Sequence, residues 1–197
     1  MAEDLNIIEE KIYQLAKPYL ATRDNDTHTQ NALDFVLRLL KTGKGDRRVA
    51  VPAIILHDVG WSKVPEDIIS MAFGPEADMN ITRIHEEEGV KIAANILNNV
   101  GYNSSQVAEI LQIIDNHDTR ENPISINDEI VRDADKLTRY SKCFWFFIGE
   151  FGMIPQEALA GLESFIEQWF FLTASKEIAR EELKHRQREI EQSHLTL

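Results

Sequence analysis

Apolar residues recur along most of the chain at steps of three and four positions, the spacing that places them on one face of an α-helix. One such series, from Leu5 to Tyr19, predicts a first helix that ends near residues 18–20. A second helix is predicted from Thr27 to Lys41, between a polar stretch suited to an N-cap and a glycine-containing turn. No segment has a convincing strand pattern, so the chain is predicted to be all-α.

A third predicted helix is buried on all sides, because residues 49–56 are all apolar. Pro52 is expected in its first turn, where a missing N–H matters little, and the helix is expected to end at Gly60. Residues 62–78 are predicted to form a loop with one short helix. Further helices are predicted at residues 80–99, from Ser104 or Ser105 to His117, from Asn127 through Leu137, and at residues 155–192.

Composition narrows the range of functions. The chain has 197 residues, which suits one domain, and a net charge of −12 from 21 basic and 33 acidic residues. Such an acidic protein is a poor candidate for binding nucleic acid through its general surface. The lone Cys143 cannot form an internal disulfide, no apolar stretch is long enough to span a membrane, and the N-terminus lacks the features of a signal peptide. A cytoplasmic protein that is not membrane-bound is therefore expected.

The step His57-Asp58 at the end of the apolar run is the strongest indication of chemistry. A buried imidazole followed by a carboxylate is costly unless something compensates the charge, and a metal ion would use both groups. A lone histidine on an apolar face is usually a hydrogen-bonded core residue. Here, however, His28, His85 and His117 also lie at the ends of apolar stripes, so four imidazoles could converge on one place.

Histidine and aspartate without cysteine favour a catalytic or redox-capable ion such as zinc, iron or manganese. The order of His28, the step His57-Asp58 and a late aspartate resembles the HD superfamily of metal-dependent phosphohydrolases, and residues 53–60 match its signature closely. The resemblance covers about residues 22–140. It implies an HD-domain helical bundle with a long C-terminal helix, forming one domain over residues 1–197 with a helical extension at 141–197.

The same resemblance implies that His28, His57, Asp58 and one late aspartate bind a metal. Asp133 and Asp135 lie on nearly opposite sides of their predicted helix, and its apolar face favours neither. The family pattern, Ala-Asp ahead of an apolar position, favours Asp135 and leaves Asp133 as a salt-bridge partner or a group that supports a ligand.

His85 and His117 are additional to the minimal pattern. Some HD hydrolases look similar in carrying two such histidines, which bind a second ion with the aspartate of the His-Asp step as the bridge. This favours two ions per chain with Asp58 between them. In the alternative with one ion, His85 and His117 would contact the phosphate of the substrate.

Phosphate recognition departs from the family pattern. Many members have lysine directly after the glycine of the His-Asp step, and here that position is Trp61. The candidates for binding the phosphate are therefore Lys63, Arg83 and Arg23, of which Arg23 lies five residues before a predicted ligand. Each would otherwise be an ordinary solvated surface charge.

The expected activity is hydrolysis of a nucleotide or another small phosphate ester by a metal-activated water, with Asp58 orienting the water or accepting its proton. Two alternatives remain open: a di-iron oxygenase of the same fold, and a non-catalytic module that senses a nucleotide or a metal. The aromatic run 144–147 is expected to be core or a homodimer contact.

Overall fold

The computed structural model describes residues 5–74, 77–150 and 152–194, and helices account for the regular structure of these ranges, with no strand among them. The all-α prediction is confirmed. The α-helices are α1 (Ile7–Ala16), α2 (Asn25–Leu40), α3 (Arg47–Leu56), α4 (Glu66–Ile69), α5 (Met79–Asn99), α6 (Ser104–Ile114), α7 (Ile126–Leu137), α8 (Phe144–Glu150), α9 (Pro155–Trp169) and α10 (Thr173–His194). Short 3-10 helices are η1 (Lys17–Tyr19), η2 (Thr22–Asp24), η3 (Val59–Lys63), η4 (Ser70–Ala72) and η5 (Thr138–Tyr140).

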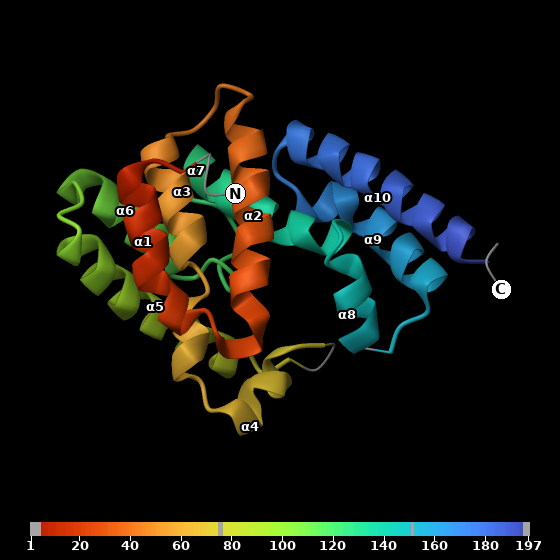
Figure 1. Ribbon diagram of the computed structural model, residues 1–197, viewed down its shortest axis with the longest axis horizontal. Helices are drawn as coiled ribbons and strands as arrows, with labels where there is room; N and C mark the ends of the chain where they lie inside the picture. The colour runs from red at the N-terminus through yellow and green to blue at the C-terminus, as the bar shows by residue number, and fades with distance from the viewer. Residues whose placement is uncertain (1–4, 75–76, 151, 195–197) are drawn as a thin grey trace.

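The helices form two groups that meet along α2 and α7. In Figure 1, α1, α3, α5 and α6 lie on one side of these two helices, and α8, α9 and α10 lie on the other. The apolar run of α3 is buried along its whole length, residues 49–56, and packs against α1, α2, α6 and α7. Because α3 has no solvent-exposed face in this run, the residues that follow it start deep inside the bundle.

Pro52 lies in the middle of α3, so its expected place in the first turn is wrong. The helix begins earlier, at Arg47, because the Asp46 side chain accepts a hydrogen bond from the Arg48 N–H and caps it. A proline inside a helix leaves the carbonyl four residues before it without its usual donor. That carbonyl belongs to Arg48, and it accepts a hydrogen bond of 2.7 Å from the hydroxyl of Tyr102 instead.

Helix α3 ends at Leu56 rather than at Gly60, and the chain continues through η3 against α5. A Cβ atom on Gly60 would lie 1.8 Å from the carbonyl oxygen of His85 and 2.5 Å from the N–H nitrogen of Gly89. Only glycine permits this approach. The contact brings the His57-Asp58 step next to His85.

The C-terminal segment is two adjacent antiparallel helices, α9 and α10, rather than the one helix predicted for residues 155–192. The break between them coincides with hydrogen bonds that α7 accepts. The carboxylate of Asp133 accepts from the N–H of Phe171 at 3.1 Å and from the N–H of Leu172 at 2.9 Å. A tertiary contact therefore accompanies the chain reversal where the local apolar pattern continues.

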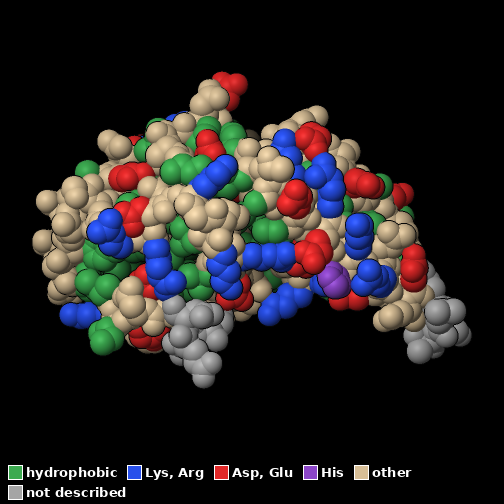
Figure 2. All heavy atoms as spheres, turned by 90° about the horizontal axis from the view of Figure 1, so that it is seen from above, with side chains coloured by type: hydrophobic (Ala, Val, Ile, Leu, Met, Phe, Trp, Pro, Cys, Tyr) green, Lys and Arg blue, Asp and Glu red, His purple; other side chains and the backbone are tan. Residues whose placement is uncertain are grey.

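Charged side chains of both signs are scattered over the surface seen in Figure 2. Figure 2 shows one face on which lysine and arginine side chains lie beside aspartate and glutamate. Several ion pairs between charged side chains join elements distant in sequence. For example, Arg38 on α2 pairs with Glu181 and Glu182 on α10. Among the described helices, none has both the length and the apolar character needed to cross a membrane.

Candidate metal centre

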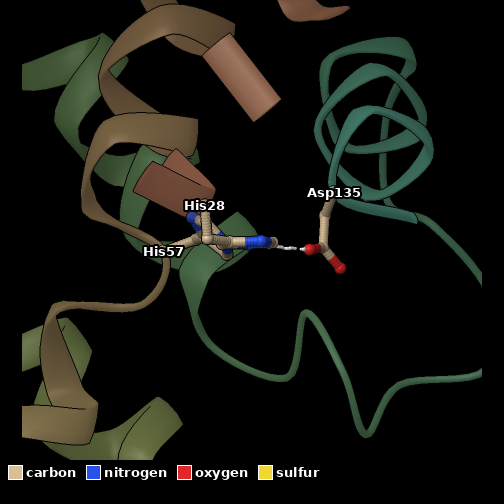
Figure 3. A group of neighbouring side chains, drawn as sticks. All are labelled: His28, His57 and Asp135. Carbon is tan, nitrogen blue, oxygen red and sulfur yellow. Dashed lines mark hydrogen bonds and ion pairs between the residues drawn. The ribbon is translucent and has the colours of Figure 1, made fainter. Parts of the chain in front are cut away.

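Three predicted ligands from three different elements meet at one point. His28 lies in the first turn of α2, His57 directly follows α3, and Asp135 lies in the last turn of α7. The Nε2 atom of His28 is 3.0 Å from Oδ1 of Asp135 and 3.2 Å from Nε2 of His57. Figure 3 shows His28 and Asp135 facing one another, with the His57 ring beside His28. We call this group the first subsite.

A second group lies nearby. The Nε2 atoms of His85, on α5, and His117, in the turn after α6, are 3.4 Å apart. Each is also 3.6 Å from Oδ2 of Asp118. We call His85, His117 and Asp118 the second subsite. Asp118 is not one of the ligands predicted from the sequence.

Asp58 lies between the two subsites and presents one oxygen to each. Its Oδ2 is 3.6 Å from Nε2 of His28 and 3.5 Å from Nε2 of His57. Its Oδ1 is 3.8 Å from Nε2 of His85 and 3.7 Å from Nε2 of His117. This is the arrangement expected of a carboxylate that bridges two ions.

The spacing of these donor atoms fits metal coordination. Two atoms that each lie about 2.1 Å from one ion are about 3.0–3.4 Å apart in octahedral or tetrahedral geometry. The closest pairs in each subsite have this separation. The other ring nitrogens of two histidines support the same role: Nδ1 of His57 is 2.7 Å from the Ile54 carbonyl, and Nδ1 of His117 is 2.8 Å from the Ile114 carbonyl. A proton on Nδ1 leaves Nε2 as a lone-pair donor that faces the centre.

The pKa values of the residues in the centre also favour a positive charge there. Burial would raise the pKa of Asp58, but His57 and the other nearby histidines hold it well below its ordinary value. Burial lowers the pKa of His85 to about 3. Burial would also lower the pKa of His117, but the negative charges of Asp118 and Asp58 outweigh it and raise this pKa to about 10. Asp58 is thus ionised, and a proton on His117 supplies positive charge that a divalent cation could replace.

Trp61 occupies the position where many family members have lysine, and it contacts the centre in two ways. Its indole N–H donates a hydrogen bond of 3.1 Å to Oδ1 of Asp58. Its ring stacks on the imidazole of His85, with centroids 4.0 Å apart and planes at 9°. Trp61 therefore orients the imidazole of His85 and the carboxylate of Asp58.

A cavity of about 380 Å³ opens onto the centre and contains His28, Asp58, His117, Asp118 and Asp135 in its lining. Its remaining walls carry three cationic side chains and an aromatic set: Arg23, Arg139 and Lys142, with Trp61, Phe73 and Phe146. These residues bring positive charge and flat apolar surface close to the ligand cluster.

The three predicted phosphate-binding residues lie in different surroundings. Arg23 lines the cavity, with its guanidinium 3.8 Å from the Phe73 ring centre, and its backbone is left-handed, with φ of 58°. Lys63 is exposed and does not line the cavity. Arg83 instead pairs with Glu86, Glu87 and Asp115.

Two cationic residues of the cavity, Arg139 and Lys142, were not among the predicted site residues. Arg139 follows Asp135 by four positions, about one helical turn, which is a signal that the sequence did contain. The aromatic run has mixed placements: Phe144 is fully buried in the core, whereas Phe146 is exposed and lines the cavity.

Comparison with known proteins identifies the class. The HD domain family matches residues 25–140, more than half of the chain, and the protein belongs to this family. Among solved structures, the fold is similar to that of a "predicted HD superfamily hydrolase" from an uncultured Thermotogales bacterium. That protein is 20% identical, with a TM-score of 0.64 over 95% of this chain and 91% of the other. No curated protein matches the sequence.

Proposed function

We propose that the protein is a metal-dependent phosphohydrolase with two divalent ions per chain, such as iron, manganese or zinc. The observation that carries this proposal is the position of Asp58, which presents one carboxylate oxygen to each of two His/Asp groups. His28, His57 and Asp135 would complete the first subsite, and His85, His117 and Asp118 the second. The similarity in fold to a predicted HD superfamily hydrolase supports this reaction class.

Ions bound there would supply an activated water and neutralise charge on the phosphoryl oxygens. The residues of the chain have three further tasks. Asp58 would be a ligand common to both groups and would orient the attacking water. The histidines that donate Nδ1–H to backbone carbonyls, His57 and His117, keep their Nε2 atoms directed inward. The acidic ligands Asp118 and Asp135 line the cavity where the reacting group would lie.

The substrate that best suits this cavity is a nucleotide or another small phosphate ester with a flat apolar part. Arg23, Arg139 and Lys142 offer cationic donors for phosphate oxygens, and Phe73 and Phe146 offer surfaces for a ring. Arg139 is supported from the C-terminal extension, because its guanidinium lies 5.4 Å from the ring centre of Trp169 on α9. The extension would thus contribute to substrate binding.

The experiment is to purify the protein with defined metals and assay a panel of nucleotides and model phosphate esters. On the best substrate, Arg139→Ala should raise KM about 10-fold or more, the usual effect of losing a charged hydrogen bond. The control is Lys63→Ala, which removes an exposed cation outside the cavity and should leave KM unchanged. Oxygen uptake with a di-iron spectrum and no hydrolysis would instead favour the oxygenase alternative. Nucleotide retention without any turnover would favour a sensing module.

A further inference from the structure

Glu86 is a buried carboxylate whose described hydrogen bonds reach no side chain of the proposed metal ligands, yet it holds the segment that carries two of these ligands. It is fully buried on α5, directly after His85. Its Oε1 accepts hydrogen bonds from the N–H of Asp118 at 2.9 Å and from the N–H of Thr119 at 3.0 Å. Its Oε2 accepts from the Thr119 hydroxyl at 2.7 Å. Three bonds therefore tie the turn after α6 to α5.

Arg83, one turn earlier on α5, completes this connection. Its Nη1 donates to Oε2 of Glu86 at 2.8 Å, which compensates the buried negative charge, and also to Oδ1 of Asn116 at 2.7 Å. Its Nη2 contacts the carboxylate of Asp115. The Arg83–Glu86 pair therefore binds both ends of the turn at residues 115–119.

The backbone of this turn is in a conformation that needs such support. Asn116 has φ of 65°, in the left-handed region that costs most residues energy, and asparagine tolerates it better than most. The residue comes directly before His117. Releasing Asn116 from Arg83 would free the turn to take a more ordinary backbone, and His117 and Asp118 would then leave their shared position facing His85.

We infer that Glu86 is a positioning residue that sets how tightly the second ion is bound, without acting on the first. This inference rests on the proposed two-ion centre. All three ligands of the second subsite belong to α5 or to the turn that Glu86 holds. The first subsite is built from α2, α3 and α7, and the described hydrogen bonds of Glu86 reach none of these helices.

The test is a titration of the metal-free protein with Mn²⁺. Calorimetry measures the affinity of each ion and metal analysis measures the number of ions bound. The electron paramagnetic resonance signal of a coupled pair of Mn²⁺ ions reports that both sites are occupied. The variant is Glu86→Gln, which replaces Oε1 or Oε2 with an NH₂ donor and so loses the pairing with Arg83 or the bonds to the turn. We expect the second Mn²⁺ to bind about 10- to 100-fold more weakly, the first to bind unchanged, and the coupled signal to be lost.

The matched control is Glu87→Gln. It makes the same chemical change one residue further along α5 and removes an ion pair with the same arginine, but Glu87 is exposed and has no described bond to the turn. It should retain both ions. Thr119→Val, which removes only the hydroxyl donor, should weaken the second ion less than Glu86→Gln does, and the intact first ion in each variant reports that the protein is folded.

Four outcomes are decisive. Selective weakening of the second ion in Glu86→Gln supports the inference. Two ions bound as tightly in Glu86→Gln as in the wild type would overturn it while leaving the two-ion centre in place. Equal weakening of both ions would also overturn it, because Glu86 would then support the fold in general. A wild type that binds one ion per chain would refute the two-ion centre itself, and this inference with it.

Discussion

The two halves of the proposed metal centre use similar side chains but are held in place by different forces. The ligands of the first subsite lie at the ends of α2, α3 and α7, which pack against one another in the hydrophobic core. The ligands of the second subsite come from α5 and from a turn. That turn depends on the buried Glu86 and on Arg83.

The histidines show the same difference. His57 and His117 each have a backbone carbonyl next to Nδ1, whereas Nδ1 of His85 is buried without a hydrogen-bond partner among the described residues. His85 is oriented by stacking on Trp61. Packing in a core tolerates the loss of one polar contact better than a hydrogen-bonded turn does. We therefore expect the second subsite to be the more easily perturbed half.

A change at Asp58 should affect both subsites equally, because its carboxylate faces both of them. Asp58→Ala should abolish binding of both ions and lower hydrolysis at least about 1,000-fold, since the metal-activated water and the charge neutralisation are lost together. Metal analysis and turnover of the best substrate measure the two effects. Asp67→Ala, an exposed aspartate on α4, is the control and should change neither. Full activity in Asp58→Ala would refute the proposed centre.

A matched pair of aspartates tests whether the halves are independent. Asp135→Ala should weaken the first ion about 100-fold, because its carboxylate is mostly buried beside His28. Asp118→Ala should weaken the second ion only about 10-fold, because 37% of the Asp118 side chain is exposed to solvent, which reduces the interaction. Mn²⁺ titration of each variant distinguishes the sites. If either change removed both ions, the two subsites would have to be treated as one cooperative unit.

Helical periodicity predicts the inward direction of the four histidines, because His28, His57, His85 and His117 lie at the ends of apolar stripes. Periodicity does not decide between Asp133 and Asp135, and only the family pattern favours Asp135. Asp118 is not predicted as a ligand because the sequence pattern predicts a helix that continues to His117. On a continuous helix the neighbouring residue would point about 100° away from His117. The helix ends at Ile114, and the left-handed Asn116 turns the chain so that both side chains face His85.

Other differences between prediction and structure also come from contacts between distant residues. The chain gives no local sign that Tyr102 will donate to the carbonyl that Pro52 leaves without a partner. The apolar sequence at residues 170–172 likewise gives no local sign of the break, where the N–H groups of Phe171 and Leu172 donate to Asp133 on another helix. The helix predicted from Asn127 begins at Ile126, because the Ser125 side chain caps it. Helix existence could be read from periodicity, whereas these boundaries depend on tertiary contacts.

Asp133 and Asp135 lie on the same helix, α7, and are expected to have different roles. Asp133 is the structural carboxylate and Asp135 is the proposed metal ligand. Asp133→Ala should lower the free energy of unfolding by about 2 kcal/mol or more, because the N–H groups of Phe171 and Leu172 lose their partner. Urea denaturation measures this change. Metal binding should remain as in the wild type, the reverse of the pattern expected for Asp135→Ala. Loss of the first ion in Asp133→Ala would mean that the two aspartates had been assigned the wrong roles.

The smallest expected effect comes from the indole of Trp61, which supports the second subsite without being a ligand. Trp61→Phe retains a flat ring to stack on His85 but removes the donor to Oδ1 of Asp58. A single hydrogen bond of this kind contributes about 0.5–1.5 kcal/mol, so the second Mn²⁺ should bind about 2- to 10-fold more weakly. Trp61→Leu also removes the stacking and should weaken it further. If the first Mn²⁺ lost affinity by the same factor as the second, Trp61 would act on both oxygens of the Asp58 carboxylate. The two subsites would then differ less in their sensitivity to mutation than their surrounding contacts indicate.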